Sequence, residues 1–284
     1  MSRREAEAAL AAGDLSAAGA KLIEAVRAAP GDAGLRAFLF EVSALAGNGE
    51  RAMKALELLG RLRPDSLDMT TDYQAALAAE TTRDRVFAGA ERPDVFGGAR
   101  AWTDGLAEAL ALDSTGDAAA AFEARAAALD AAPASPGTVD GERFEWFADA
   151  DTRLGPVLEA VINGAYRWIP FEEIGALEIE PPKDLRDLVW SVGVLTLADG
   201  GQWPVLIPTR YPGSEKAGAE IALARRTEWR PLGPEELGHA AGLGQRLFAH
   251  AEADVPILEL RSLVFDHAAD ADEADAAQDP TAEG

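Results

Sequence analysis

The first half of the chain carries a repeating helical pattern of apolar positions. From residue 15 to residue 62, apolar side chains recur at intervals of three and four, which predicts amphipathic helices with one buried face. Gly13, Gly47 and Gly116 are each followed by a proline 17 residues later, and the first two glycines lie 34 residues apart. A period of about 34 residues is typical of tetratricopeptide-type helical hairpins, in which glycine and proline act as stop signals. The spacing predicts a stack of hairpins over residues 1–132, with the three glycines at equivalent turns.

A longer segment, at about residues 66–102, separates the second hairpin from the third. Its pattern predicts one long helix that ends near Phe87, followed by a loop through Gly97 and Gly98. An irregular helical bundle obeys the same packing rules, so the apolar pattern leaves that alternative open. A hairpin solenoid would also expose a concave face of the kind that binds peptides and helices.

Residues 144–171 join the helical half to a second half with strand-like patterns. Pro156 suits a first helical position and Asn163-Gly164 supplies a left-handed stop, so we expect a short helix between them. The buried face of this helix is predicted to consist of Leu154, Val157, Leu158, Val161 and Ile162. An aromatic alternation over residues 166–170 then predicts a strand. A buried helix and an aromatic strand are therefore expected where the two halves meet.

The rest of the chain shows the short alternating runs and turn signals of antiparallel strands. Asp199-Gly200-Gly201 predicts a hairpin turn between apolar runs at 189–198 and 203–207. Further strands are expected at 177–180, 227–230, 245–250 and 257–265, and a short helix at 217–225. The predicted fold class is α+β and multidomain: an N-terminal tetratricopeptide-like α-α hairpin solenoid, then a small antiparallel α+β domain over residues 133–265.

The chain ends in an acidic tail. Residues 266–284 contain seven Asp and Glu and neither Lys nor Arg, a composition typical of disordered segments. We expect this tail to be disordered and dispensable for folding, because alanines and acids bury too little apolar surface to offset the entropy of ordering.

The chain is strongly acidic as a whole. Its 284 residues include 49 Asp and Glu against 26 Lys and Arg, a formal net charge of −23. Such a charge repels phosphates, so neither nucleic acid nor an anionic membrane is expected as a partner. The chain has no cysteine, which excludes disulfides, thiol catalysis and thiolate metal sites. It also lacks a secretory signal pattern and an apolar run of the roughly 18–20 residues that span a bilayer, so we expect a cytoplasmic protein.

Few residues suggest a catalytic or metal site. Asp149 and Asp151 are two carboxylates two residues apart, which can bind a divalent cation in extended backbone. The alternative is that they cap turns and pair with Arg153. Gly242-Leu-Gly244 lacks the last glycine of a dinucleotide fingerprint. The histidines are scattered along the chain and are expected at the surface: His239, His250 and His267. We expect no cofactor, metal or catalytic constellation.

Arginines beside aromatic residues suggest protein contacts on this acidic chain, because that combination is common at interfaces. On the first helix of the second hairpin, Arg36 and Phe40 are one turn apart, so both can touch one amphipathic partner helix. A place for Phe40 in the hairpin core is an equally good alternative, and Trp229 is expected to be buried. The candidate partner-binding residues are Arg36, Phe40, Ser43, Arg210, Tyr211, Arg225 and Arg226.

A series of short motifs in fixed order resembles the ImpE/TagJ family over nearly the whole chain up to Phe265. The motifs are Leu10-x-x-Gly-Asp14, Arg36-x-Phe-Leu-Phe40, Gly137-Thr-Val-Asp-Gly141, Phe144-Glu-Trp146, Ala148-Asp-Ala-Asp151, Arg153-Leu-Gly-Pro156, Trp168-Ile-Pro-Phe171, Asp184-Leu-Arg-Asp-Leu-Val-Trp190, Ile207-Pro-Thr-Arg-Tyr-Pro-Gly-Ser214 and Arg225-Arg-Thr-Glu-Trp229. The resemblance implies a tetratricopeptide-like N-terminal domain joined to a distinct C-terminal domain. It also implies an accessory protein of the bacterial type VI secretion system, which binds an N-terminal segment of the small contractile-sheath subunit and is linked to the AAA+ unfoldase that recycles the sheath. No catalytic residues follow from it.

Three functions compete at this point. The leading hypothesis is a cytoplasmic adaptor that binds a helix of a sheath component. The second is a metal-dependent enzyme that uses Asp149 and Asp151. The third is a structural subunit that associates with itself as a homo-oligomer.

Overall fold

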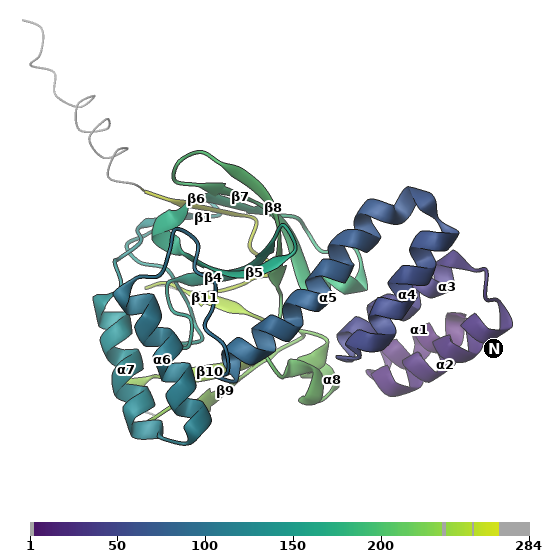
Figure 1. Ribbon diagram of the computed structural model, residues 1–284, viewed down its shortest axis with the longest axis horizontal. Helices are drawn as coiled ribbons and strands as arrows, with labels where there is room; N and C mark the ends of the chain where they lie inside the picture. Colours follow the sequence, from purple (N-terminus) through teal and green to yellow (C-terminus); the bar gives the residue numbers. More distant parts are fainter. Residues whose placement is uncertain (1–2, 235–236, 252, 267–284) are drawn as a thin grey trace, which may run out of the picture.

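The structure is a computed structural model and describes residues 3–234, 237–251 and 253–266. Helices come first in the chain and an antiparallel sheet follows, as Figure 1 shows. The main helices are α1 (Arg3–Ala11), α2 (Leu15–Ala28), α3 (Ala33–Leu45), α4 (Gly49–Leu62), α5 (Leu67–Phe87), α6 (Ala101–Thr115) and α7 (Ala118–Ala131). The predicted fold class, helical hairpins followed by an antiparallel α+β part, is confirmed.

The three glycine turns are equivalent, as predicted. Gly13, Gly47 and Gly116 all have positive φ angles, of 80°, 67° and 83°, which glycine adopts without steric cost. Each turn is followed by a residue whose side chain accepts a backbone hydrogen bond from the first turn of the next helix: Asp14, Asn48 and Asp117. Local turn chemistry thus fixes the hairpins α1–α2, α3–α4 and α6–α7.

The third hairpin does not continue the stack of the first two. Helices α1 to α4 share a core with the first half of α5, where Phe40 contacts Tyr73. The second half of α5 joins α6 and α7 in another core, in which Trp102 and Val86 pack with Trp168 of the sheet. Figure 1 shows α5 running between the two groups of helices. The segment after α5 pairs with the sheet at Val95, so α6 and α7 lie against the sheet.

Eight antiparallel strands form the main sheet, in the order β2-β1-β13-β6-β7-β8-β4-β5. They are β1 (Gly137–Val139), β2 (Glu142–Phe144), β4 (Val157–Ile162), β5 (Ala165–Pro170), β6 (Ile174–Ile179), β7 (Trp190–Leu197), β8 (Gln202–Pro208) and β13 (Ser262–Phe265). Two smaller sheets consist of β3 (Ala148–Asp149), β11 (Leu247–Ala249) and β12 (Asp254–Pro256), and of β9 (Thr227–Pro231) and β10 (Ala240–Gly244). The short helix α8 spans Ala219–Ala222. One face of the main sheet encloses an apolar core that includes Leu177, Leu195 and Leu263.

The predicted helix between Pro156 and Asn163 is wrong, because residues 157–162 form strand β4. All six residues are buried and all but Glu159 are apolar, so the alternation of apolar and polar positions that marks a half-exposed strand is absent. Asn163 and Gly164 have φ angles of 50° and 75°, which is the geometry of a tight hairpin turn into β5. The same Asn-Gly pair thus ends a strand where a helix stop was expected.

The other strand predictions hold in part. The hairpin of β7 and β8 forms around Asp199-Gly200-Gly201 as expected. The run at 245–250 contains only the three residues of β11, and the run at 257–265 becomes a strand only from Ser262. Strand β10 was not expected, because glycines are poor strand formers. The tail prediction concerns residues 266–284, and all of these except Asp266 lie outside the described residues. No helix in the described ranges is long and apolar enough to cross a membrane.

Candidate functional site

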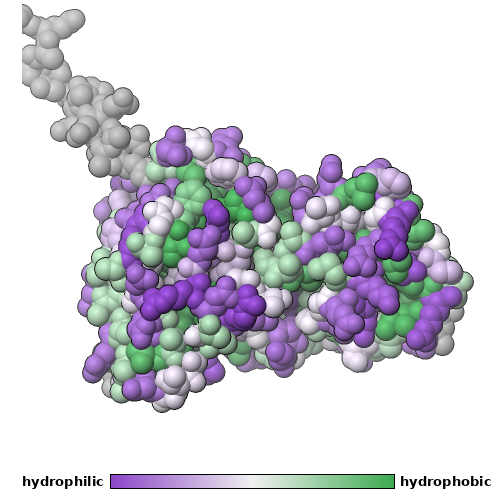
Figure 2. All heavy atoms as spheres, in the orientation of Figure 1, coloured by the Kyte–Doolittle hydropathy of each residue, from purple (hydrophilic) through white to green (hydrophobic). Residues whose placement is uncertain are grey.

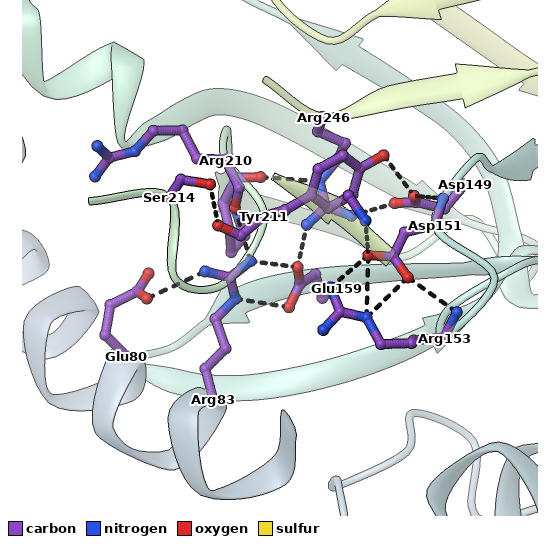
Figure 3. A network of polar contacts seen from close by, with 12 residues as sticks. Glu80, Arg83, Asp149, Asp151, Arg153, Glu159, Arg210, Tyr211, Ser214 and Arg246 are labelled. Atoms are coloured by element: carbon purple, nitrogen blue, oxygen red, sulfur yellow. Dashed lines mark hydrogen bonds and ion pairs between the residues drawn. The ribbon is translucent and has the colours of Figure 1, made fainter. Parts of the chain in front are cut away.

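The most unusual site is a cluster of buried charges between α5 and the sheet. Arg83 of α5 donates from Nε and Nη2 to the carboxylate of Glu159 on β4, at 2.8 and 2.6 Å. Glu159 also contacts Arg246, which precedes β11, and both side chains are 0% exposed. Figure 3 shows these side chains pointing toward one another from three separate elements. Segments that are distant in sequence therefore meet at one carboxylate.

A second carboxylate completes the cluster. Arg246 pairs with Asp149 of β3, and its Nε donates to the carbonyl of Pro208 at 2.9 Å. The Tyr211 hydroxyl lies 2.9 Å from Asp149 Oδ1. We call Arg83, Asp149, Glu159 and Arg246 the buried ionic network. Its two arginines balance its two carboxylates, which is the condition under which buried charges are tolerated.

The two carboxylates have opposite pKa shifts. Burial acts to raise the pKa of Glu159, but the guanidinium groups of Arg83 and Arg246 outweigh it and lower this pKa to about 2. The hydroxyl of Tyr166 adds a hydrogen bond of 2.7 Å to the same carboxylate. Burial raises the pKa of Asp149 to about 7 against the attraction of Arg246. Glu159 is thus the firmly charged centre of the network.

The carboxylate of Asp151 accepts hydrogen bonds from its own turn and from strand β10. Arg153 donates from its backbone N–H and from Nε to Asp151 Oδ1, at 3.0 and 2.9 Å. The backbone N–H of Gly242 donates to Oδ2 at 2.9 Å. The expected pairing of Asp151 with Arg153 is present, while Asp149 faces Arg246. Within the described ranges, no group of three or more His, Asp or Glu is placed to hold a metal ion.

The candidate residues on α3 do not form one exposed row. Phe40 is fully buried in the hairpin core, the alternative that the sequence left open. The Ser43 hydroxyl is buried and donates to the Leu39 carbonyl. Arg36 is half-buried and donates to the Pro30 carbonyl, at 3.3 Å from Nε and 3.1 Å from Nη2.

The other candidates divide into a buried pair and an exposed pair. Arg210 donates to the carbonyls of Leu45 and Ala222, so it ties the second hairpin to the sheet half of the molecule. Its neighbour Tyr211 belongs to the polar surroundings of Asp149. Arg225 and Arg226 are exposed and pair with acidic residues of their own segment, Glu220 and Glu228.

Two residues differ from their expected burial. Trp229 is 40% exposed on β9, where its ring lies 5.7 Å from that of Tyr211, so the expectation of a buried tryptophan is wrong. His250 is buried beside Phe147, although a surface position was expected. His239 is half-buried against Phe122, and His267 lies outside the described residues.

The surface of the described residues includes two grooves. The hairpin groove, of about 490 Å³, lies between α2, α3 and the start of α4; its lining includes Leu15, Ile23, Val42, Ser43, Arg51 and Glu215. The α5–sheet groove, of about 600 Å³, lies beside the first half of α5; its lining includes Met69, Asp72, Val192, Pro204 and Leu206. Helices α1 to α4 form one lobe of the molecule, the helical lobe, and the sheet with α6 and α7 forms the other, the sheet lobe (Figure 1). Figure 2 shows the outline of the molecule narrowing between them.

Three residues of the buried ionic network were not predicted from the sequence: Arg83, Glu159 and Arg246. One signal was available: Glu159 lies inside the apolar run Val157–Ile162, where an unpaired charge is too costly to bury. That signal requires a cationic partner but does not identify it, because Arg83 and Arg246 are 76 and 87 residues away.

Comparisons with known proteins agree with the motifs found in the sequence. A model of the ImpE protein family matches residues 141–264. The type VI secretion system accessory component TagJ of Pseudomonas aeruginosa is 42% identical over 262 residues, which are 92% of this chain and 91% of the relative. The X-ray crystal structure of protein VPA1032 from Vibrio parahaemolyticus matches with a TM-score of 0.84 and 26% identity, over 92% of this chain and 97% of the other. Since its likeness to TagJ extends over both the helical and the sheet parts, this chain belongs to the ImpE/TagJ family of type VI secretion system accessory proteins.

Proposed function

We propose that this protein is a non-catalytic adaptor of the type VI secretion system. It binds an N-terminal helix of the small sheath subunit and connects it to the AAA+ unfoldase that recycles the sheath. Membership of an accessory-protein family supports the general role. The observation that carries the specific proposal is the hairpin groove, because grooves between helical hairpins are suited to a peptide in helical form.

The lining of the hairpin groove suits an amphipathic helix. Leu15 and Ile23 are partly exposed and offer apolar contact, while Ser16 and Arg51 offer hydrogen bonds at its margin. Its volume of about 490 Å³ suits a few anchoring side chains of such a helix rather than the whole helix. Binding energy at such sites usually depends on a small number of anchors.

The sheet half of the molecule contributes to the same groove. Glu215 lines it from the segment that follows Tyr211, and its Cγ would lie 2.3 Å from a Cβ at Gly47. The hairpin turn and the sheet half are therefore in close contact at the edge of the groove. A helix bound there would touch both parts.

Two matched tryptophan substitutions on α2 test the proposal. Ala20 is exposed and lines the groove, whereas Ala28 is exposed on the same helix but does not line it. We expect Ala20→Trp to weaken binding of a fluorescent sheath N-terminal peptide at least tenfold, since its ring would occupy the groove. Ala28→Trp should leave binding unchanged. Equal affinities for both variants would contradict this placement, and no binding by the wild-type protein would contradict the sheath proposal itself.

The link to the unfoldase needs its own measurement. We expect the unfoldase to co-elute in size-exclusion chromatography with this protein already bound to the sheath peptide. Light scattering of the protein alone tests the remaining alternative, self-association. A mass that rises with concentration would favour a structural homo-oligomer over a monomeric adaptor.

A further inference from the structure

The α5–sheet groove lies where the helical cover of the sheet ends. Helices α5, α6 and α7 cover the second face of the sheet over β4 and β5, where Val157, Val161 and Trp168 enter their core. Strands β8 and β7 come next in the sheet, and there the floor of the groove is formed by Leu206 of β8 and Val192 of β7. Met69 of α5 forms its apolar wall.

The apolar floor continues beyond the groove onto the open face of the sheet. In the register of β7 with β8, Val192 lies opposite Leu206, and two residues further along β7 Val194 lies opposite Pro204. Val194 is 42% exposed, as is Val264 two strands away on β13. The opposite face of the same strands forms the core, so these residues share the uncovered side. Strand β6 lies between the two valines with Glu178 and Ala176 on this side, so the apolar surface that adjoins the groove consists of Val194 and Pro204. Exposed apolar residues next to a groove are a feature of interaction sites.

The charges around the groove have a negative excess. Lys183 and Arg186 line it, but they already pair with Glu180 and Asp184 respectively. Asp72 at its margin forms no ion pair among the described residues. Glu178, next to Val194 on the open face, forms none there either. A ligand with positive charge on its flanks would complement this rim.

We propose that the α5–sheet groove and the adjoining open face bind an amphipathic helix of a partner protein, apolar on one side and flanked by Lys or Arg. Such a helix would extend the layer of α5 across β8 and β7, the usual way in which a helix covers a sheet. Residues 192–196 of β7 run for about 17 Å, the length of a helix of roughly 11 residues. This site is separate from the hairpin groove and does not depend on the sheath proposal.

A second copy of the chain is a poor occupant for the same surface. Each copy carries a formal net charge of −23, so a symmetric contact would bring like charges together around the acidic rim. A basic helix instead gains from the field of the whole protein as it approaches. Binding should therefore weaken as salt is added.

Two synthetic peptides of about 14 residues, or four helical turns, serve as probes. Both carry leucines at i, i+3, i+4 and i+7; one has lysines at its remaining positions and the other has glutamates. We expect the lysine peptide alone to bind in an anisotropy titration. With methyl-labelled protein, its NMR shifts should concentrate on Val192, Val194 and Leu206.

Substitutions at exposed positions separate specific binding from general attraction to an acidic protein. Asp72→Arg should weaken the lysine peptide about fivefold at low salt, and Val194→Asp should abolish binding. Glu123→Arg, the same charge reversal on an exposed residue of α7, should have little effect. Equal weakening by Asp72→Arg and Glu123→Arg, or shifts spread over other methyl groups, would overturn the proposal. So would protection of Val194 by self-association of the free protein.

The sheath peptide supplies an independent comparison. If it shifts methyl groups of the hairpin groove and leaves Val192 and Val194 unchanged, the two sites are separate, as proposed. If the lysine peptide binds as expected but the sheath peptide binds nowhere, the proposed function fails and the second site stands. If neither peptide contacts Val192 or Val194, the second site is wrong whatever the sheath peptide does elsewhere.

Discussion

Arg83→Met is the sharpest test of the buried ionic network. Methionine is unbranched and replaces the apolar stem of arginine without its guanidinium group, so the change mainly removes the charge and the donors. Four hydrogen bonds disappear: two to Glu159, one of 2.8 Å to the Arg210 carbonyl, and one of 3.3 Å from Nη1 to the Glu80 carboxylate. Glu159 would then share Arg246 with Asp149, which leaves two buried carboxylates on one arginine.

The expected cost follows from that imbalance. Removing one partner of a buried ion pair typically destabilises a protein by about 3–5 kcal/mol, because the remaining charge stays buried without its partner. Apolar contacts of the methionine side chain offset part of this, so we expect about 3 kcal/mol. For a protein of this size such a loss lowers the melting temperature by roughly 6–12 °C.

Urea unfolding followed by tryptophan fluorescence measures the loss, and Arg85→Met is the matched control. Arg85 lies two residues further along α5, but its side chain is exposed and pairs with Glu91, so its loss should cost at most about 1 kcal/mol. In a double-mutant cycle, adding Glu159→Gln to Arg83→Met should cost less than the sum of the two single changes. If both methionine variants unfold at the same urea concentration, our account of the network is wrong.

Three further predictions concern the same part of the fold. The pKa of Glu159 is lowered from 4.5 to about 2, so its charged carboxylate stabilises the folded protein fully above pH 4.5, and this stabilisation is lost as the pH falls toward 2. Glu159→Gln should therefore flatten the pH dependence of the melting temperature below about pH 4.5. Leu158→Ala on β4 should cost about 2–5 kcal/mol in chemical unfolding, because Leu158 is fully buried, and wild-type stability would place β4 outside the core. A Cβ at Gly242 would lie 2.2 Å from the Tyr211 ring, so Gly242→Ala should lower the melting temperature, whereas Gly49→Ala, with open space around it, should not.

The helical hairpins could be predicted from the sequence because their signals are local. The glycine spacing predicted turns at Gly13 and Gly47, and the structure has both. The side chains that cap the next helices, Asp14 and Asn48, also act within a single turn. Long helix α5 was likewise found, with its end at Phe87. The position of α6 and α7 against the sheet was not predicted, because it depends on long-range contacts such as the packing of Trp102 with residues of the sheet.

Strand β4 shows why the candidate site was harder to predict. Val157, Val161 and Ile162 fit a helical face, yet the same residues are β-branched and favour a strand. Burial on both sides removed the alternation that would have decided between them. Once β4 is taken for a helix, Glu159 points away from the predicted buried face and its need for partners disappears. One wrong element thereby concealed the whole buried ionic network.

Helix α5 fixes the relation between the two lobes through two different kinds of contact. Its first half is held by apolar packing, with Tyr73 between Phe40 and Trp190. Its second half is also packed in an apolar core through Val86, and in addition Arg83 joins it to the buried ionic network, which is costly to break. At 21 residues the helix is about 31 Å long, so a small rotation at Arg83 would displace its far end by several ångström. The hairpin groove and the α5–sheet groove both border elements attached to this helix. The contact of Arg83 with Glu159 therefore joins the helix that borders the α5–sheet groove to strand β4 of the sheet.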